Sequence, residues 1–287
     1  MTFHQSPATY INEVLLKVKN LHQSIEFYEK TLGLHLLLQT ERTAVLSANG
    51  DTPLISLEQP VDVVEKQPTR TTGLYHFALL LPSRVELAKL LTHLIESNYP
   101  IQGASDHLVS EAIYLADPDG NGIEIYIDRP SNEWEWQDGQ VKMAVDPMDA
   151  EALLAEAVGH EWANISPGTV MGHIHMHVSD LGKAESFYCD GLGFNVVCQF
   201  GNQALFISSQ DYHHHIGLNT WAGVGAPPPD EKSVGISWYQ IVYPDSKSRK
   251  QVLANLSQQG FSVEEVSNEF YTVDPAGNKI KLSVSEE

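Results

Sequence analysis

Two histidines and one glutamate form a set of side chains that could bind a catalytic metal ion. His76 and His173 each lie in an apolar run, and Glu124 follows an Asp-Pro-Asp-Gly turn. Two neutral imidazoles and one carboxylate on one face of a metal leave up to three coordination positions open. That arrangement suits a non-haem Fe(II) ion that must bind a substrate and O2 together. Mn(II) is an alternative, because the same ligands bind it.

Each of these residues, taken alone, also has an ordinary structural interpretation. A histidine in a strand is more often hydrogen-bonded in the core or at the surface than bound to a metal. Glu124 could simply face solvent. The ligand interpretation is favoured because His76 and His173 hold the same position in repeated strands, where the other two repeats have Glu13 and Trp238.

A second group of residues could transfer protons beside such a metal. His107 and Tyr114 precede the glutamate within one short stretch, and three consecutive histidines, His213, His214 and His215, precede an apolar run. Histidine and tyrosine are common general acids and bases. The alternatives are aromatic packing for the tyrosine, a loop position for His107 and a surface cluster for the three histidines.

Composition limits the classes of partner. The chain has 287 residues, of which 42% are hydrophobic, enough for a large buried core and more typical of two domains than of one. A net charge of -20 repels phosphate backbones and anionic lipids, so no nucleic acid or membrane partner is expected. Small molecules and other copies of the chain, in a homo-oligomer, are the expected partners. Two cysteines and no apolar targeting segment indicate the cytoplasm.

The two halves of the chain are duplicated. Residues 21–33 and 181–193 share Leu, Phe-Tyr and Leu-Gly at identical spacing. Further on, the Asp-Pro-x-Gly-Asn turn of residues 117–126 recurs in residues 274–283. Repeats of this kind indicate a fold built from equivalent units.

Each half divides again, because every quarter reads as an apolar strand, a capped helix and several short β-rich runs. We therefore predict an α+β fold of four βαβββ modules, which pair into two concave sheet barrels with a cleft as the ligand site. The modules span residues 10–60, 73–128, 170–222 and 234–285. The predicted domains are residues 1–128, a linker at 129–168 with a helix from Met148 to Val158, and residues 169–287.

Local signals mark the helices of these modules. Asn20 and Asp180 are good N-caps, and Ser83 forms a capping box with Glu86. Glycines 33, 193 and 260 stand where helices are expected to end.

One stretch carries a specific motif, His107-x5-Ile113-Tyr114-x2-Asp117-Pro118-x-Gly120-x3-Glu124. It resembles the signature of the type I extradiol dioxygenases, the catechol 2,3-dioxygenase family of the vicinal oxygen chelate (glyoxalase/bleomycin resistance) superfamily. The resemblance extends over all four modules. It is strongest to short bacterial catechol-2,3-dioxygenase-like proteins with the sequences Gly-Leu-Tyr-His-Phe-Ala, here residues 73–78, and Gly-His-Ile-His, here residues 172–175.

The resemblance implies roles for these residues. His76, Glu124 and His173 would be the metal ligands, and His107 and Tyr114 would line the substrate pocket and hydrogen-bond the substrate hydroxyl. The implied reaction is opening of a catechol ring beside the diol by O2, with Fe(II) as cofactor.

The acid/base group among the three consecutive histidines has two candidates. Alternation along a strand favours His215 for the cleft, since Ile216 and Leu218 would face the helices. Alignment to the family motif favours His214 instead. His213, Asn219 and Trp221 are further candidates for the substrate pocket.

The sequence departs from the family in one respect. The usual arrangement has the signature in the last module, but there this chain has Trp238 and Lys281. We therefore expect the active cleft between modules two and three, with modules one and four as support. The linker would then form a pocket wall, for which Trp134 and Trp136 are candidates, unless they are interface anchors.

Two other functions are compatible with the same fold. One is a glyoxalase-like or thiol-transferase metalloenzyme, although the acidic chain offers no obvious basic cradle for an anionic thiol. The other is a metal-free protein that sequesters an aromatic ligand.

Overall fold

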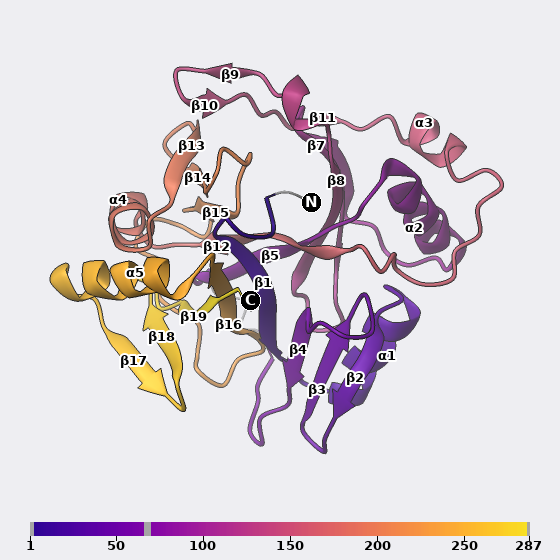
Figure 1. Ribbon diagram of the computed structural model, residues 1–287. Coiled ribbons are helices and arrows are strands. Elements are labelled where there is room, and N and C mark those ends of the chain that lie inside the picture. Colours follow the sequence, from indigo (N-terminus) through magenta and orange to yellow (C-terminus); the bar gives the residue numbers. More distant parts are fainter. Residues whose placement is uncertain (1–2, 66–69, 286–287) are drawn as a thin grey trace.

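The computed structural model describes residues 3–65 and 70–285 and contains two large curved β-sheets (Figure 1). The eight-stranded sheet joins modules one and four, in the order β17 (Val263–Val266), β18 (Glu269–Val273), β19 (Lys279–Val284), β16 (Gly235–Tyr243), β1 (Tyr10–Lys17), β4 (Ile55–Glu58), β3 (Thr43–Ser47) and β2 (His35–Gln39).

The nine-stranded sheet joins modules two and three. Its order is β11 (Asp146–Pro147), β6 (Gly103–Asp106), β7 (Ser110–Ala116), β8 (Gly122–Asp128), β5 (Gly73–Leu80), β12 (Val170–His177), β15 (Ile216–Asn219), β14 (Ala204–Ser208) and β13 (Asn195–Phe200). The predicted pairing of module two with three and of one with four is confirmed. Because both sheets combine strands from residues 1–128 and 169–287, the two halves of the chain are interleaved.

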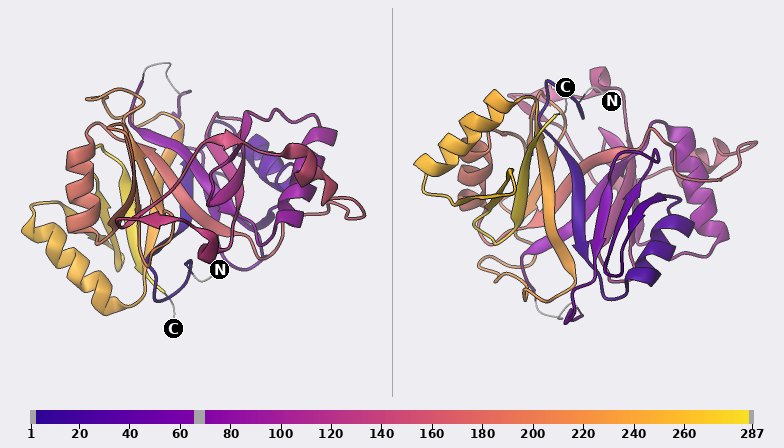
Figure 2. Two further views of the ribbon diagram at one scale, coloured as in Figure 1. Left: turned by 90° about the horizontal axis from the view of Figure 1, so that it is seen from above. Right: turned by 60° about the horizontal axis from the view of Figure 1, so that its bottom comes forward.

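The helices lie on the outer sides of the sheets (Figure 2). Helices α1 and α2 lie on one side of the molecule, and α4 and α5 lie on the opposite side. The helices are α1 (Leu21–Lys30), α2 (Arg84–Glu96), α3 (Ala150–Ala155), α4 (Leu181–Glu185) with the π-helical turn η2 (Ser186–Gly191), and α5 (Ser246–Gln258).

The predicted N-caps and helix-ending glycines are confirmed, whereas the Glu86 side chain of the predicted capping box pairs with Lys89. The side chains of Asn20, Ser83 and Asp180 each accept a hydrogen bond from the backbone three residues later, at Gln23, Glu86 and Lys183. Glycines 33, 193 and 260 have φ between +73° and +88°, a conformation that ends helices with little strain in glycine alone.

The linker helix is shorter than predicted. Helix α3 begins at Ala150, because the side chain of Asp149 caps it by accepting from the backbone N–H of Ala152, and it ends at Ala155. The rest of the linker contains the short helix η1 (Ser131–Glu133) and a hairpin of β9 (Trp136–Gln137) and β10 (Gln140–Val141).

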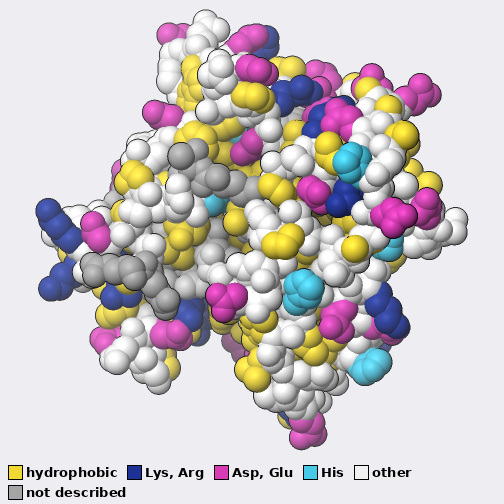
Figure 3. Space-filling model, turned by 45° about the vertical axis from the view of Figure 1, so that its right-hand side comes forward, with side chains coloured by type: hydrophobic (Ala, Val, Ile, Leu, Met, Phe, Trp, Pro, Cys, Tyr) yellow, Lys and Arg dark blue, Asp and Glu magenta, His cyan; other side chains and the backbone are white. Residues whose placement is uncertain are grey.

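Figure 3 views the side of the molecule that carries α1 to α3, where acidic side chains are spread among apolar and basic ones. Within the described part of the chain, no helix is both long and apolar enough to cross a membrane.

Candidate metal centre

Three adjacent strands of the nine-stranded sheet bring the candidate ligands together. Glu124 of β8 pairs with Ala78 of β5, and Ala78 pairs on its other side with His173 of β12. His76 lies two residues before Ala78 and therefore projects from the same face. The repeat and the strand period thus place two imidazoles and one carboxylate over a small residue.

The three side chains converge closely. The Nε2 atom of His76 lies 3.0 Å from Oε2 of Glu124, and Nε2 of His173 lies 3.3 Å from the same oxygen. One ligand atom from each residue lies within 4.8 Å of the others. All three side chains are buried.

A divalent metal ion fits this donor set. Despite its proximity to Glu124, Nε2 of His76 does not form a well-directed hydrogen bond, and it is a buried nitrogen without a partner. Such atoms are rare in folded proteins and usually indicate a missing ion or water. A cation between Nε2 of His76 and the carboxylate of Glu124 would satisfy both.

Electrostatics favour the protonation states that a metal requires. Burial lowers the pKa of His173 to about 4, so its ring is neutral near pH 7. Burial alone would raise the pKa of Glu124, but His173 and His76 hold it well below its usual value. The carboxylate is therefore ionised beside a neutral imidazole.

Close backbone packing sets the position of His173. A Cβ atom on the preceding residue, Gly172, would lie 2.0 Å from the hydroxyl oxygen of Tyr126, whose ring packs against His173 at a centroid distance of 4.8 Å. Only glycine permits this approach.

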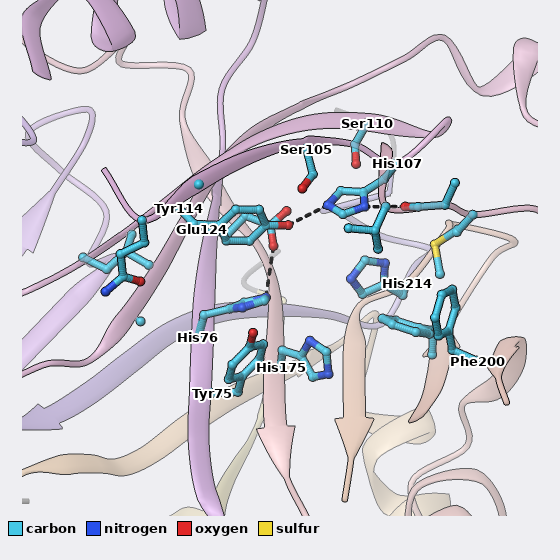
Figure 4. Close-up of a pocket in the computed structure, with 18 of the residues that line it drawn as sticks. Tyr75, His76, Ser105, His107, Ser110, Tyr114, Glu124, His175, Phe200 and His214 are labelled. Carbon is cyan, nitrogen blue, oxygen red and sulfur yellow. Dashed lines mark hydrogen bonds and ion pairs between the residues drawn. The ribbon is translucent and has the colours of Figure 1, made fainter. Parts of the chain in front are cut away.

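A cavity of about 410 Å³ is lined by two of the three candidate ligands, His76 and Glu124 (Figure 4). Its described lining contains no lysine or arginine. The lining residues are Tyr75, His76, Gln102, Gly103, Ser105, His107, Val109, Ser110, Tyr114, Leu115, Gly122, Ile123, Glu124, Met143, Ala144, Val145, His175, Phe200, Phe206, His214 and Trp221.

His107 and Tyr114 form a hydrogen-bonded pair at this cavity. Nδ1 of His107 lies 2.7 Å from the carbonyl oxygen of Ala144, which can only accept, so Nδ1 carries the proton. In the neutral ring, Nε2 then accepts from the Tyr114 hydroxyl at 2.5 Å. Burial and then the charge of Glu124 raise the pKa of Tyr114, so the hydroxyl stays protonated.

The three consecutive histidines have different surroundings. His214 lines the cavity, whereas His213 and His215 are fully buried behind it and are not among the lining residues. Nε2 of His215 lies 2.9 Å from the carbonyl oxygen of Phe3. The alternation argument for His215 does not apply, because β15 begins only at Ile216.

Of two other residues expected in the pocket, one lines the cavity and the other lies behind it. Trp221 lines the cavity and is 41% exposed. Asn219 is fully buried and supports the site from behind, since its Nδ2 lies 2.9 Å from Nε2 of His175. His175 is a cavity residue that the sequence interpretation missed, although it lies two residues after His173 and therefore faces the same side.

The linker forms part of the cavity wall through Met143, Ala144 and Val145. The two tryptophans proposed for this wall lie elsewhere. Trp134 packs against Phe3 at a ring distance of 5.6 Å, and Trp136 lies in the exposed hairpin.

Comparison with known proteins agrees with the fold. Residues 10–125 and 170–284 match the family model of the glyoxalase/bleomycin resistance protein/dioxygenase superfamily. The chain belongs to this superfamily. The superfamily resemblance and the α+β fold expected from the sequence are confirmed.

Named relatives include enzymes. A catechol-2,3-dioxygenase from Bacillus subtilis (strain 168) is 44% identical over 269 residues, which cover 93% of this chain and 94% of that protein. Metallothiol transferase FosB from Lysinibacillus sphaericus is 30% identical over 118 residues, covering 40% of this chain and 80% of that protein. The chain is therefore a homologue of catechol-2,3-dioxygenase along most of its length.

The fold is also shared with a solved structure of glyoxalase I from Zea mays. The TM-score is 0.58 at 17% sequence identity, and the match covers 96% of this chain and 92% of that chain.

Proposed function

We propose that this chain is an Fe(II)-dependent extradiol dioxygenase that opens the ring of a catechol-type diol with O2, with His76, Glu124 and His173 as metal ligands. The observation that carries the proposal is their convergence at the end of a cavity that also contains His107, Tyr114 and His214. The homology to catechol-2,3-dioxygenase supports it. Mn(II) is a second metal that these ligands would hold.

When bound, the metal would supply a centre that holds the diol oxygens and O2 together and lets electrons pass between them. The chain's residues supply the other requirements. His214 would accept a proton from a diol hydroxyl, because burial keeps its pKa well below the usual value and its ring neutral. The oxygen of the Tyr114 hydroxyl, which donates its proton to His107, would accept a hydrogen bond from a substrate hydroxyl.

Apolar side chains would position the rest of the ring and exclude water. Phe200, Phe206 and Met143 line the cavity beyond the polar end. Trp221 stands at the exposed side, where its indole contacts the ring of Tyr75 at a centroid distance of 5.3 Å. An aromatic diol would therefore be held with its oxygens toward Glu124.

The similarity to metallothiol transferase FosB keeps thiol transfer as a second candidate, over a part of the chain. The described cavity lining offers no lysine or arginine to an anionic thiol. A metal-free protein that sequesters an aromatic ligand is the third candidate. A cytoplasmic location and assembly into a homo-oligomer stay predictions.

The test is anaerobic purification, loading with Fe(II) or Mn(II), and addition of a panel of catechols with O2. We expect consumption of one O2 per catechol and a yellow semialdehyde from cleavage beside the diol. Bound metal without O2 uptake on any catechol would reject the dioxygenase in favour of the thiol transferase. Failure to bind metal would favour the sequestering protein.

A further inference from the structure

A short chain of hydrogen bonds leads from the cavity to the end of strand β8. Nδ1 of His214 lies 2.8 Å from Nδ1 of His213, and Nε2 of His213 lies 2.8 Å from Oδ1 of Asp128. Asp128 lies four residues after Glu124 on the same strand, so both side chains project from one face. The chain of contacts thus begins at a cavity residue and ends at a carboxylate.

The direction of these hydrogen bonds is fixed by chemistry. An ionised carboxylate only accepts, so Nε2 of His213 carries the proton that it donates to Asp128. In the neutral ring, Nδ1 of His213 has no proton and accepts from Nδ1 of His214. The remaining nitrogen of His214, Nε2, is then unprotonated.

The opposite direction would require a second proton on His213. That residue is fully buried, and a second proton would create a charged ring next to the rings of Tyr126 and Trp134. One proton on each histidine, at Nε2 of His213 and at Nδ1 of His214, satisfies both hydrogen bonds, so this arrangement requires no charged ring.

Asp128 accepts a second hydrogen bond. Its side chain is 23% exposed, and its Oδ1 also accepts from the hydroxyl of Tyr212 at 3.1 Å. The Tyr212 hydroxyl is in turn 2.7 Å from that of Tyr126. Two donors therefore stabilise one carboxylate that also contacts solvent.

Nε2 of His214 is available to a substrate. Among the described residues, none forms a hydrogen bond with this atom, and the side chain lines the cavity. Its ring packs against that of His173 at a centroid distance of 4.1 Å, which holds it beside the ligands. The unprotonated nitrogen is therefore the one left for a diol hydroxyl.

We propose that Asp128 is a positioning residue that acts through His213 and fixes His214 in the tautomer whose unprotonated Nε2 is presented to the cavity. The catalytic consequence rests on the proposed function, because Asp128 would prepare His214 to accept a proton from the diol. The tautomer of His214 does not depend on the reaction.

The kinetic test compares Asp128→Leu, His213→Phe and the double variant as Fe(II)-loaded enzymes. Each single change should lower kcat by about 10²-fold, the lower end for general acid–base catalysis, with little change in KM. Because both residues act through one path, the double variant should be no slower than the slower single variant. Tyr188→Phe is the matched control, since it removes a buried hydroxyl that donates to another carboxylate, Asp274, outside the cavity lining, and it should retain kcat.

The second readout is the ¹⁵N spectrum of labelled histidine in the Zn(II)-loaded protein, with His214 assigned by the loss of its signals in His214→Gln. We expect protonated Nδ1 and unprotonated Nε2 for His214 in the wild type, and mixed tautomers in Asp128→Leu. A protonated Nε2 in the wild type, or the same spectrum in both proteins, would overturn the proposal.

The two readouts separate this inference from the proposed function. If no catechol is turned over, the dioxygenase proposal fails and the spectrum still decides the tautomer. If catechol is turned over but the effects of the two single variants multiply in the double variant, the dioxygenase stands and the path through His213 is rejected. Equal metal content and thermal midpoints identify variants that fold normally.

Discussion

Glu124 and Lys281 occupy corresponding positions in the two sheets. Each pairs in parallel with the first strand of its own module, Glu124 with β5 and Lys281 with β16. The Lys281 ammonium lies 5.3 Å from the ring centroid of Trp238, the residue that corresponds to His76. In the eight-stranded sheet a lysine therefore supplies a positive charge at the position where we propose that the nine-stranded sheet binds a metal. Residues of the eight-stranded sheet thus serve as matched controls.

The first prediction separates two neighbouring histidines. His214→Ala should lower kcat by about 10²- to 10⁴-fold, because the cavity loses its proton acceptor. His215→Ala should leave kcat nearly unchanged and lower the free energy of unfolding by about 1–3 kcal/mol, because the carbonyl of Phe3 loses its donor. Steady-state kinetics and urea unfolding of both variants measure this. The reverse pattern would assign the proton acceptor to His215.

The second prediction concerns the tyrosine at the cavity. Tyr114→Phe should lower kcat at least 10-fold, since the hydroxyl that would contact a substrate oxygen is lost. Tyr271 provides the control, because it pairs with Lys281 as Tyr114 pairs with Glu124. Tyr271→Phe should retain wild-type kinetics. Equal effects in both variants would place Tyr114 outside the reaction.

The third prediction concerns the substrate. Because the described cavity lining has no lysine or arginine, a carboxylate on the ring would be buried without a partner. We expect kcat/KM for 4-methylcatechol to exceed that for 3,4-dihydroxybenzoate by about 10²-fold or more, equivalent to about 3 kcal/mol. Met143→Arg should lower the ratio of the two kcat/KM values, because the new arginine would pair with the carboxylate. Similar values for the two substrates in the wild type would show that the ring substituent lies outside this cavity.

The fourth prediction is a loss of stability in acid. Nε2 of His4 lies 2.8 Å from the carbonyl oxygen of Gly172, and burial lowers the pKa of His4 to about 4. Between pH 6.5 and 4 the unfolded chain therefore binds a proton that the folded chain does not. The free energy of unfolding should fall as pH falls through this window, by about 1.4 kcal/mol per pH unit from this residue.

The variant His4→Gln isolates this contribution, since glutamine can still donate to the carbonyl of Gly172. From pH 6.5 to pH 5, the metal-free wild type should lose about 2 kcal/mol more than the variant in urea unfolding. Parallel losses in the two proteins would show that His4 is protonated in the folded state.

Much of the fold could be predicted because its signals are local and repeated. The Leu, Phe-Tyr and Leu-Gly spacing occurs twice, and the caps at Asn20 and Asp180 act within one helical turn. The grouping of His76, Glu124 and His173 follows from strand alternation combined with the repeat. Asp128 could have been found by the same alternation, because it lies on the face of β8 that carries Glu124.

The remaining parts of the site depend on contacts between distant segments. The path of the linker follows the packing of Trp134 against Phe3, which is more than a hundred residues away in the chain. The choice between His214 and His215 depends on where β15 begins, and no residue near position 216 signals that boundary. Side chains alternate between two faces only within a strand, and His215 precedes β15. The alternation argument therefore wrongly favoured His215 for the cleft.

The most direct test of the central claim measures Fe(II) content and O2 uptake with catechol for the wild type, Glu124→Gln and Lys281→Gln. The account predicts one metal ion per chain and O2 uptake for the wild type and Lys281→Gln, with both lost in Glu124→Gln. Metal content and O2 uptake retained in Glu124→Gln would contradict the metal centre between modules two and three.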